Sequence, residues 1–169
     1  GCAVGILNAP DDQFHPARDE LLPHNYDADS HVEGKRQNKL IFQEKVGLRQ
    51  DPDAPLFFWP SRLDNIQKGC ELLAHILYDV TADYEDERLQ IAFVASGPFA
   101  HHFRNIVALH DLHERVAVYG FNEEVSHLGY AAADFVLMPS AFEPCGLPQM
   151  IGATYGALPV VHDTGGLHD

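Results

Sequence analysis

Charged and glycine residues gather just after several apolar runs of the chain. Arg62 and Lys68 bracket the stretch SRLDNIQKG, Glu143 lies in SAFEPCGL, and DTGGL follows the last apolar run. Two fixed cations beside the free N–H groups of helix starts are the groups that bind and stabilise a diphosphate leaving group. Ordinary solvated charges and simple glycine turns would produce the same residue pattern, so the pattern alone does not decide between these and a diphosphate site.

Other residue types that carry chemistry lack the partners they need. The histidine pairs at 101–102 and at 110 and 113 fall on one expected helix with no third ligand nearby, so no metal site is predicted. Cys145 has no histidine or asparagine in its own motif, which argues against a role as a nucleophile. A role as a small residue that lets the backbone approach a ligand is favoured instead. The three cysteines are far apart and form no CxxC pair, so neither a zinc ribbon nor a disulfide scaffold is indicated.

The formal charge of −14, from 25 acidic and 11 basic side chains, argues against nucleic acid as a partner. No local basic stripe offsets it, so an anionic ligand must be held by a few placed cations and backbone N–H groups. No apolar run approaches the roughly 18 residues that span a bilayer, and no signal-peptide pattern opens the chain. We therefore expect a cytoplasmic protein that binds neither nucleic acid nor a membrane.

Apolar periodicity predicts the elements that position these residues. A loop-like start and a helix over 34–48 precede five strand-like apolar runs that alternate with amphipathic helices. The expected strands are 55–63, 89–97, 116–121, 135–140 and 158–163, and the expected helices are 68–84, 99–112, 123–133 and 146–156. This alternation predicts an α/β fold with a Rossmann-like, doubly wound parallel sheet that helices cover on both faces.

The order of these elements also predicts a domain division and the place of a site. Residues 1–50 are expected to form a linker segment with the first helix, and residues 51–169 a Rossmann-like domain. The expected buried face of the helix over 68–84 consists of Leu72, Leu73, Ile76, Leu77 and Val80. Ligands bind at the carboxyl ends of the strands in such sheets, so the loops that carry Arg62, Lys68 and Glu143 should meet there.

Four motifs in order, SRLDNIQKG, MPSAFEPCGLPQM, YGALPVV and TGGLHD, resemble the C-terminal nucleotide-sugar-binding domain of bacterial glycogen synthases and plant starch synthases. These are retaining glucosyltransferases with the two-domain GT-B fold, of which this chain would be the C-terminal half. The resemblance implies that residues 51–169 lack the last strand and the closing helix of that domain. Upstream, GILNAPDD, HPARDELLPHNY and GKRQNK are similar to the segment that crosses between the two domains. The resemblance implies the transfer of glucose from ADP-glucose or UDP-glucose to glycogen or starch, in the cytoplasm or, in a plant, in a plastid.

The resemblance further implies a role for each site residue, with no metal or other cofactor. Arg62 and Lys68 match the cations that neutralise the diphosphate of the donor, and Glu143 matches the carboxylate that holds hydroxyls of the transferred glucose. Phe121 matches an aromatic residue that stacks on the nucleotide base. The residues that would line the sugar and phosphate are Cys145, Gly146 and Leu147, with Thr164, Gly165 and Gly166 on the phosphate side.

Several positions depart from the family pattern. Ala141 stands where the family has a basic residue, Pro148 where it has a hydroxyl residue, Ile151 where it has an aromatic, and NAPDD where it has NGID. Proline is tolerated in the first turn of a helix, although it removes one N–H group. These changes bear on donor affinity and phosphate contacts more than on the fold.

Two functions of different class remain open. In the first, the chain is the donor-binding half of an α-1,4-glucan synthase whose acceptor surface belongs to an N-terminal domain outside these 169 residues, so the isolated chain is expected to be inactive. In the second, it is a non-catalytic nucleotide-sugar-binding or interaction module. Retention of Arg62, Lys68 and Glu143 favours the first. A glycosyltransferase with another acceptor is a weaker third alternative, because the position eight after Glu143 is Ile151 and not a second glutamate.

Overall fold

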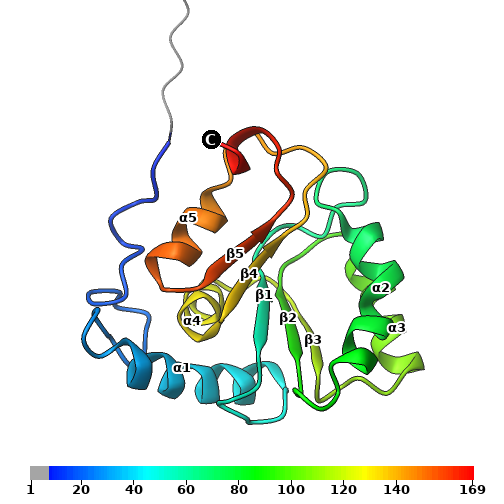
Figure 1. Cartoon of the computed structure of the whole chain (residues 1–169), viewed down its shortest axis with the longest axis horizontal. Helices are drawn as coiled ribbons and strands as arrows, with labels where there is room; N and C mark the ends of the chain where they lie inside the picture. Colours follow the sequence, from blue (N-terminus) through cyan, green and yellow to red (C-terminus); the bar gives the residue numbers. More distant parts are fainter. Residues whose placement is uncertain (1–7) are drawn as a thin grey trace, which may run out of the picture.

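The computed structural model describes residues 8–169 as a parallel sheet with helices on both sides (Figure 1). Its strands are β1 (Leu56–Trp59), β2 (Gln90–Val94), β3 (Val116–Tyr119), β4 (Phe135–Met138) and β5 (Leu158–Val161). They lie in the order β3-β2-β1-β4-β5, and all neighbouring strands run parallel. The Rossmann-like, doubly wound class predicted from the sequence is therefore confirmed.

Helices connect the strands as the alternating pattern predicts. They are α1 (His31–Val46), α2 (Cys70–Asp83), α3 (Ala100–Leu109), α4 (Glu123–Ala132) and α5 (Leu147–Thr154), and a 3-10 turn, η1 (Gly165–Leu167), follows β5. The observed strands are shorter than predicted, because residues such as Arg62 already lie in the loop after the strand. Cys2 and residues 5–7 of the GILNAPDD motif lie outside the described residues.

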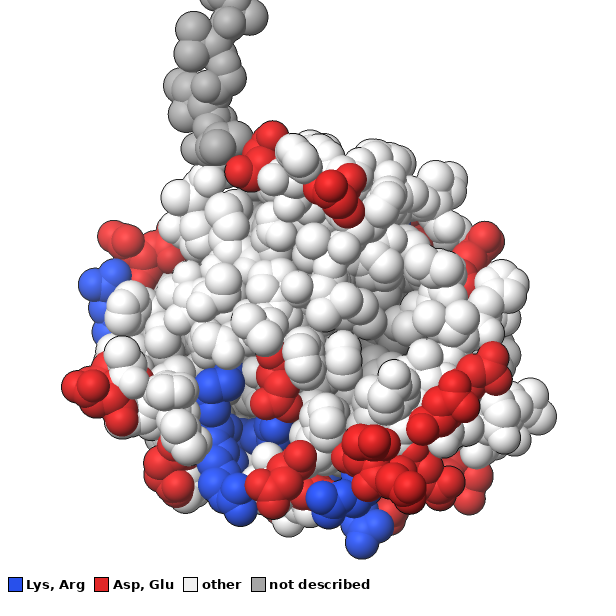
Figure 2. Space-filling view, viewed as in Figure 1, with Lys and Arg blue, Asp and Glu red and all other residues white. Residues whose placement is uncertain are grey.

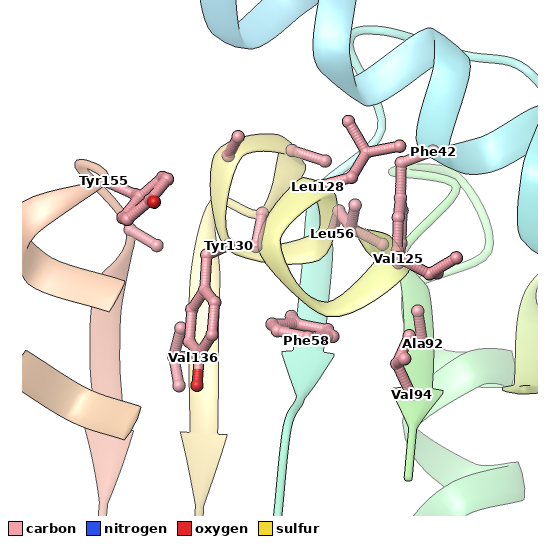
Figure 3. Packing of buried hydrophobic residues seen from close by; sticks show 14 of the residues in the cluster. Phe42, Leu56, Phe58, Ala92, Val94, Val125, Leu128, Tyr130, Val136 and Tyr155 are labelled. Atoms are coloured by element: carbon pink, nitrogen blue, oxygen red, sulfur yellow. The ribbon is translucent and has the colours of Figure 1, made fainter. Parts of the chain in front are cut away.

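Helices α1, α4 and α5 cover one face of the sheet, where the larger apolar core lies. The ring of Phe58 on β1 meets Phe42 of α1 and Tyr130 of α4 edge to face, with ring centroids 6.0 and 5.1 Å apart (Figure 3). A Cβ at Gly129 would lie 2.6 Å from the Phe58 ring, so α4 needs glycine to approach the strand this closely. This packing fixes α4 and, with it, the start of β4.

Helices α2 and α3 cover the opposite face over β1, β2 and β3. The Phe93 ring stacks on Phe103 at a centroid distance of 4.4 Å, and Trp59 packs beside both. Trp59 also donates a hydrogen bond to the Ser61 carbonyl over 2.8 Å, which fixes the chain as it leaves β1. The loop that carries Arg62 therefore starts from a well-anchored position.

The buried face of α2 is narrower than predicted. Leu73 and Leu77 are buried together with Cys70, as residues three and four apart on one side of a helix. Leu72 and Ile76, in contrast, are 59% and 43% exposed, so their prediction as buried residues is wrong. The reason is that α2 meets the sheet along a single line of residues, and the neighbouring line faces solvent.

Coverage of this second face does not extend to the edge strand β5. Leu158 and Val160 are 66% and 42% exposed, although α5 packs on the other side of β4 and β5. The prediction that helices cover both faces therefore holds over β1–β3 and is wrong at β5. In Figure 2 the charged side chains gather along the lower margin near α1, and the surface over α5 and β5 is largely uncharged.

The segment before α1 contributes to the same core as α4 and α5. Leu22 and Tyr26 are buried in it, and the Tyr26 hydroxyl donates to the Tyr155 carbonyl over 2.8 Å. This part of the predicted linker is therefore packed against the sheet domain. Over residues 8–169, no helix is long and apolar enough to cross a membrane.

Candidate functional site

Three segments meet at the carboxyl end of the sheet: the loops after β1 and β4, and the turn after β5 (Figure 1). The Ala141 N–H donates to the Gln67 carbonyl over 2.8 Å, which joins the first two loops. The Gly166 N–H donates to the Glu143 carbonyl over 2.8 Å, and the Gln149 side-chain amide donates to the Gly166 carbonyl over 3.1 Å. The convergence expected from a parallel sheet is present.

Lys68 and Glu143 form an ion pair where these loops meet. Lys68 Nζ lies 2.6 Å from Glu143 Oε2, and the two side chains are only 11% and 9% exposed. The Ser140 hydroxyl donates to the same carboxylate oxygen over 3.4 Å. A charge-assisted hydrogen bond with so little water around it is much stronger than a surface pair. The structure therefore brings together two residues that lie 75 positions apart in the sequence.

Arg62 lies in the same loop as Lys68 but is exposed. Among residues 8–169, its guanidinium donates only to the Gln67 side-chain oxygen, over 3.5 Å. The neighbouring Asp64 carboxylate accepts from the N–H groups of Ile66 and Gln67, and these bonds, with the charges of Arg62 and Lys68, hold the pKa of Asp64 below its usual value. Arg62 thus has a weak protein partner and is free to meet an anion.

Several glycines of the site serve contacts between the loops. A Cβ at Gly69 would lie 2.1 Å from the Pro139 carbonyl oxygen, and Gly69 has a φ of 76°. A Cβ at Gly165 would lie 2.2 Å from the Glu143 carbonyl oxygen, and one at Gly166 would lie 2.2 Å from the Cys145 carbonyl oxygen. Glycine therefore allows two loops of the chain to approach each other closely here. The sequence had suggested instead that these glycines allow a ligand to approach the backbone.

The first turn of α5 faces this junction. Gly146, with a φ of 84°, precedes the helix, and a Cβ there would meet the Leu167 side chain at 2.6 Å. Leu147 is 38% exposed, and Pro148 lies in the first turn, where a proline is compatible with the helix. Cys145 is partly buried just before it. The predicted residues 145–147 therefore form one surface with the turn after β5.

Thr164 precedes η1 in extended backbone, with φ −150° and ψ 136°, and its carbonyl accepts from the Leu167 N–H over 3.1 Å. Its side chain is partly buried. Thr164, Gly165 and Gly166 thus follow β5 in the turn that packs against the Glu143 loop. This places the predicted phosphate side next to the predicted sugar side.

Phe121 lies apart from this cluster, after β3, and is 64% exposed. Its N–H donates to the Ser96 hydroxyl over 3.2 Å, which joins the loops after β2 and β3. The sequence interpretation did not single out Phe142, which is 53% exposed and directly precedes Glu143. Both rings lie in loops at the carboxyl end of the sheet, where an aromatic face is available to a ligand.

A cavity of about 270 Å³ opens beside α5, with Cys145, Gln149 and Gly166 in its wall, but Arg62, Lys68 and Glu143 do not line it.

Burial raises the pKa of the Cys70 thiol to about 11, so this thiol stays protonated and unreactive at neutral pH. Within residues 8–169, no group of three or more His, Cys, Asp or Glu side chains is arranged to hold a metal ion.

Sequence reasoning missed two polar residues of the site, Gln67 and Ser140. Gln67 contacts Arg62 and, through its amide, the Phe142 carbonyl over 3.4 Å. Ser140 donates to Glu143. Their place in the motifs SRLDNIQKG and SAFEPCGL was the available signal, but only the meeting of the two loops shows what they contact.

The family model described as glycosyl transferases group 1 matches residues 54–169. The glycogen synthases of Bacillus licheniformis and Exiguobacterium sibiricum are 42% and 44% identical to this chain, over 98% of it and 34% of each relative. The structure titled catalytic domain of starch synthase IV from Arabidopsis thaliana bound to ADP and acarbose has a TM-score of 0.83 and 36% identity, over 98% of this chain and 34% of that one.

A more distant structure, that of Anabaena HepE in complex with UDP and glucose, has a TM-score of 0.58 at 24% identity and shares the fold. The chain spans about a third of the length of the curated relatives that it matches. These similarities confirm the family that the sequence motifs indicated. The chain belongs to the group 1 glycosyltransferases, and its sequence is most like that of glycogen synthases among the relatives named here.

Proposed function

We propose that the chain is the donor-binding domain of a retaining α-1,4-glucan synthase that transfers glucose from ADP-glucose or UDP-glucose to the non-reducing end of glycogen or starch. The observation that carries this proposal is the Lys68–Glu143 pair, 2.6 Å apart, with Arg62 exposed in the same loop. The proposal is supported by the relatives, which are named glycogen synthases, and by the ADP bound in the starch synthase structure.

In this proposal, Arg62 and Lys68 bind the diphosphate. When the bond between the glucosyl carbon and the phosphate oxygen breaks, the electron pair stays on the diphosphate and positive charge develops on the sugar ring. Cations placed beside the departing oxygens stabilise that charge separation most where water is scarce. Lys68 meets this condition because its side chain is 11% exposed.

Glu143 holds sugar hydroxyls and does not attack the sugar. Its carboxylate already accepts from Lys68 and from Ser140, so it is fixed in place as a hydrogen-bond acceptor. A glycosidase that retains configuration uses two carboxylates about 5–5.5 Å apart across the bond. The partner of Glu143 at short range is instead a lysine, which suits a transfer whose charge is stabilised on the phosphate.

The remaining residues contact the donor from the sides. Phe121 stacks on the nucleotide base, because its exposed ring stands at the end of β3. The backbone from Cys145 to Leu147 and from Thr164 to Gly166 lines the sugar and the phosphates, since these two stretches pack against each other. The acceptor surface is assigned to a part of the protein beyond these residues, in line with relatives about three times as long.

Titration of ADP and UDP into the chain, followed by calorimetry, tests this assignment. Saturable binding of at least one nucleotide is expected, with no glucan elongation from ADP-glucose and glycogen by the chain alone. Phe121→Ala should weaken nucleotide binding about tenfold, as expected for the loss of one base–aromatic stack. Leu109→Ala is the matched control, because Leu109 is 79% exposed at the end of α3. Failure of both nucleotides to bind would contradict the proposal.

A further inference from the structure

The Lys68–Glu143 pair sets the charge balance of the site. The lysine that the proposed function assigns to phosphate is already neutralised by the carboxylate assigned to sugar, over 2.6 Å. Within residues 8–169, the exposed Arg62 has only a weak, neutral partner, the amide oxygen of Gln67 at 3.5 Å. A diphosphate that enters the site therefore finds Arg62 available, whereas Lys68 must leave the Glu143 carboxylate or be shared with it.

Geometry limits how the lysine can be shared. A phosphate oxygen that accepts from Lys68 Nζ at about 2.8 Å lies no farther than about 5.4 Å from Glu143 Oε2 while the pair is intact, because Nζ and Oε2 are 2.6 Å apart. At this separation one ammonium charge is shared between two negative groups, and little water is present to compensate the second group because both side chains of the pair are about nine-tenths buried. Ser140 also donates to Glu143, but its hydroxyl is neutral and lies 3.4 Å away, so it offsets little of the negative charge on the carboxylate.

A sugar attached to the diphosphate changes this balance. Its hydroxyl groups donate hydrogen bonds to the Glu143 carboxylate. These bonds replace the hydrogen bond from Lys68 that the carboxylate loses when Lys68 binds the phosphate. A free diphosphate brings no such donors. Lys68 has three N–H donors but a single positive charge, so it can donate to the carboxylate and the phosphate together while neutralising only one of them.

We propose, resting on the proposed function, that the Lys68–Glu143 pair discriminates between donor and product. The sugar nucleotide opens the pair and binds to both of its members, whereas the free nucleoside diphosphate left after transfer competes with Glu143 for Lys68. Recapture of Lys68 by Glu143 then weakens product binding and favours release. Glu143 is thus a determinant of specificity for the sugar-bearing nucleotide in addition to its contact with the sugar.

Calorimetric titration of ADP and of ADP-glucose into the wild-type chain and three variants tests this inference. The variants are Glu143→Gln, Lys68→Met and the double variant. Glu143→Gln should tighten ADP binding about five- to tenfold, the size of a typical coupling between two groups, and should lower the preference for ADP-glucose over ADP about tenfold. In the Lys68→Met background the same change should leave ADP affinity within about twofold.

Asp134→Asn is the matched control. Asp134 Oδ2 lies 2.6 Å from Lys39 Nζ in a second short lysine–carboxylate pair, whose side chains are 36% and 6% exposed, but Asp134 precedes β4 at the opposite end of the sheet. This variant should lose stability and keep its ADP affinity. The comparison separates the effect of the site pair from any general effect of removing one negative charge.

Weaker or unchanged ADP binding by Glu143→Gln would overturn the inference while leaving the proposed function intact. Equal tightening with and without Lys68 would also overturn it, because the carboxylate would then act by general repulsion. Absence of ADP binding in every variant would overturn the proposed function as well. Near-ultraviolet circular dichroism checks folding, and Glu143→Ala replaces Glu143→Gln if the latter is not folded, with the same tightening of ADP expected.

Discussion

The Tyr155 hydroxyl donates a hydrogen bond to Asp19 Oδ2 over 2.5 Å, and so joins the end of α5 to the segment before α1. His127 Nδ1 on α4 lies 2.8 Å from the same oxygen. Burial, and then the hydrogen bond to Asp19, raise the pKa of Tyr155, which keeps the hydroxyl protonated as the donor. Asp19, at 3% exposure, is therefore a buried carboxylate that ties three elements together.

Tyr155→Phe should lower the free energy of unfolding by about 2 kcal/mol, because it leaves a buried carboxylate short of one donor. Urea denaturation followed by circular dichroism measures this. Asp12→Asn is the control, since the Asp12 side chain is fully exposed and 3.8 Å from Arg18, and it should change stability by less than about 0.5 kcal/mol. Equal stability of Tyr155→Phe and the wild-type chain would show that Asp19 is satisfied by other donors.

This cluster marks a limit of prediction from sequence. The strand–helix alternation that gave the fold depends on local periodicity, and the elements were placed to within a few residues. The Asp19–Tyr155 contact joins positions 136 residues apart, and Asp19 lies in a stretch rich in proline and aspartate that has loop composition. Nothing local in that stretch indicates burial, so its composition predicts a linker.

Arg62→Ala should weaken ADP binding about 10- to 100-fold and leave stability unchanged, because Arg62 is exposed and its guanidinium makes a long hydrogen bond to Gln67. Lys68→Ala should weaken ADP less than Arg62→Ala does, since Lys68 must leave Glu143 to meet a phosphate. Calorimetry compares the two affinities. Arg36→Ala, which removes a surface pair with Asp53, is the control and should bind ADP as the wild-type chain does.

Lys68→Ala should also lower the free energy of unfolding, by about 2 kcal/mol, because the Glu143 carboxylate stays buried without its cation. Thermal or urea unfolding without nucleotide measures this loss. Lys68→Ala with wild-type stability would mean that water or Ser140 satisfies Glu143 fully. That result would remove the electrostatic basis for discrimination between donor and product.

The site was predicted as a set of residues, but its internal contacts were not. Motif positions placed Lys68 and Glu143 in loops at one end of the sheet, because parallel strands end together there. The sequence could not show that the two side chains pair with each other. Pairing depends on side-chain directions in two irregular loops, which follow from packing against glycines such as Gly69 and Gly165.

Gly166→Ala should lower ADP affinity at least about tenfold, because its Cβ would lie 2.2 Å from the Cys145 carbonyl oxygen and force the loop after β4 to move. Gly120→Ala is the matched control at the same end of the sheet, because a Cβ at Gly120 would meet no heavy atom of residues 8–169 within 4 Å apart from its chain neighbours. Calorimetry with ADP measures both variants. Equal affinity of Gly166→Ala and Gly120→Ala would show that the turn after β5 does not shape the nucleotide site.

Lys35 provides a test of the packing behind the site. Lys35 Nζ donates to the carbonyls of Ala131 and Tyr155 over 3.1 and 3.0 Å, at the ends of α4 and α5. Burial, and to a lesser extent the charge of Lys39, lower the pKa of Lys35 from 10.5 to about 8, while the charge of Asp134 opposes this. The folded chain therefore releases this proton at a lower pH than the unfolded chain does.

Between about pH 8 and 10.5 the unfolded state binds the Lys35 proton more tightly than the folded state, so stability contributed by this group rises with pH across that window. Below the window both states are protonated, and the folded state bears the full cost of a buried charge. The free energy of unfolding of the wild-type chain, relative to Lys35→Met, should therefore increase by about 2 kcal/mol from neutral pH to about pH 10. Because other lysines and tyrosines titrate in both proteins alike, only the difference between the two urea-denaturation series reports on Lys35. A difference that stays flat or falls as the pH rises would mean that the Lys35 ammonium is stabilised by the carbonyls around it and keeps its ordinary affinity for the proton.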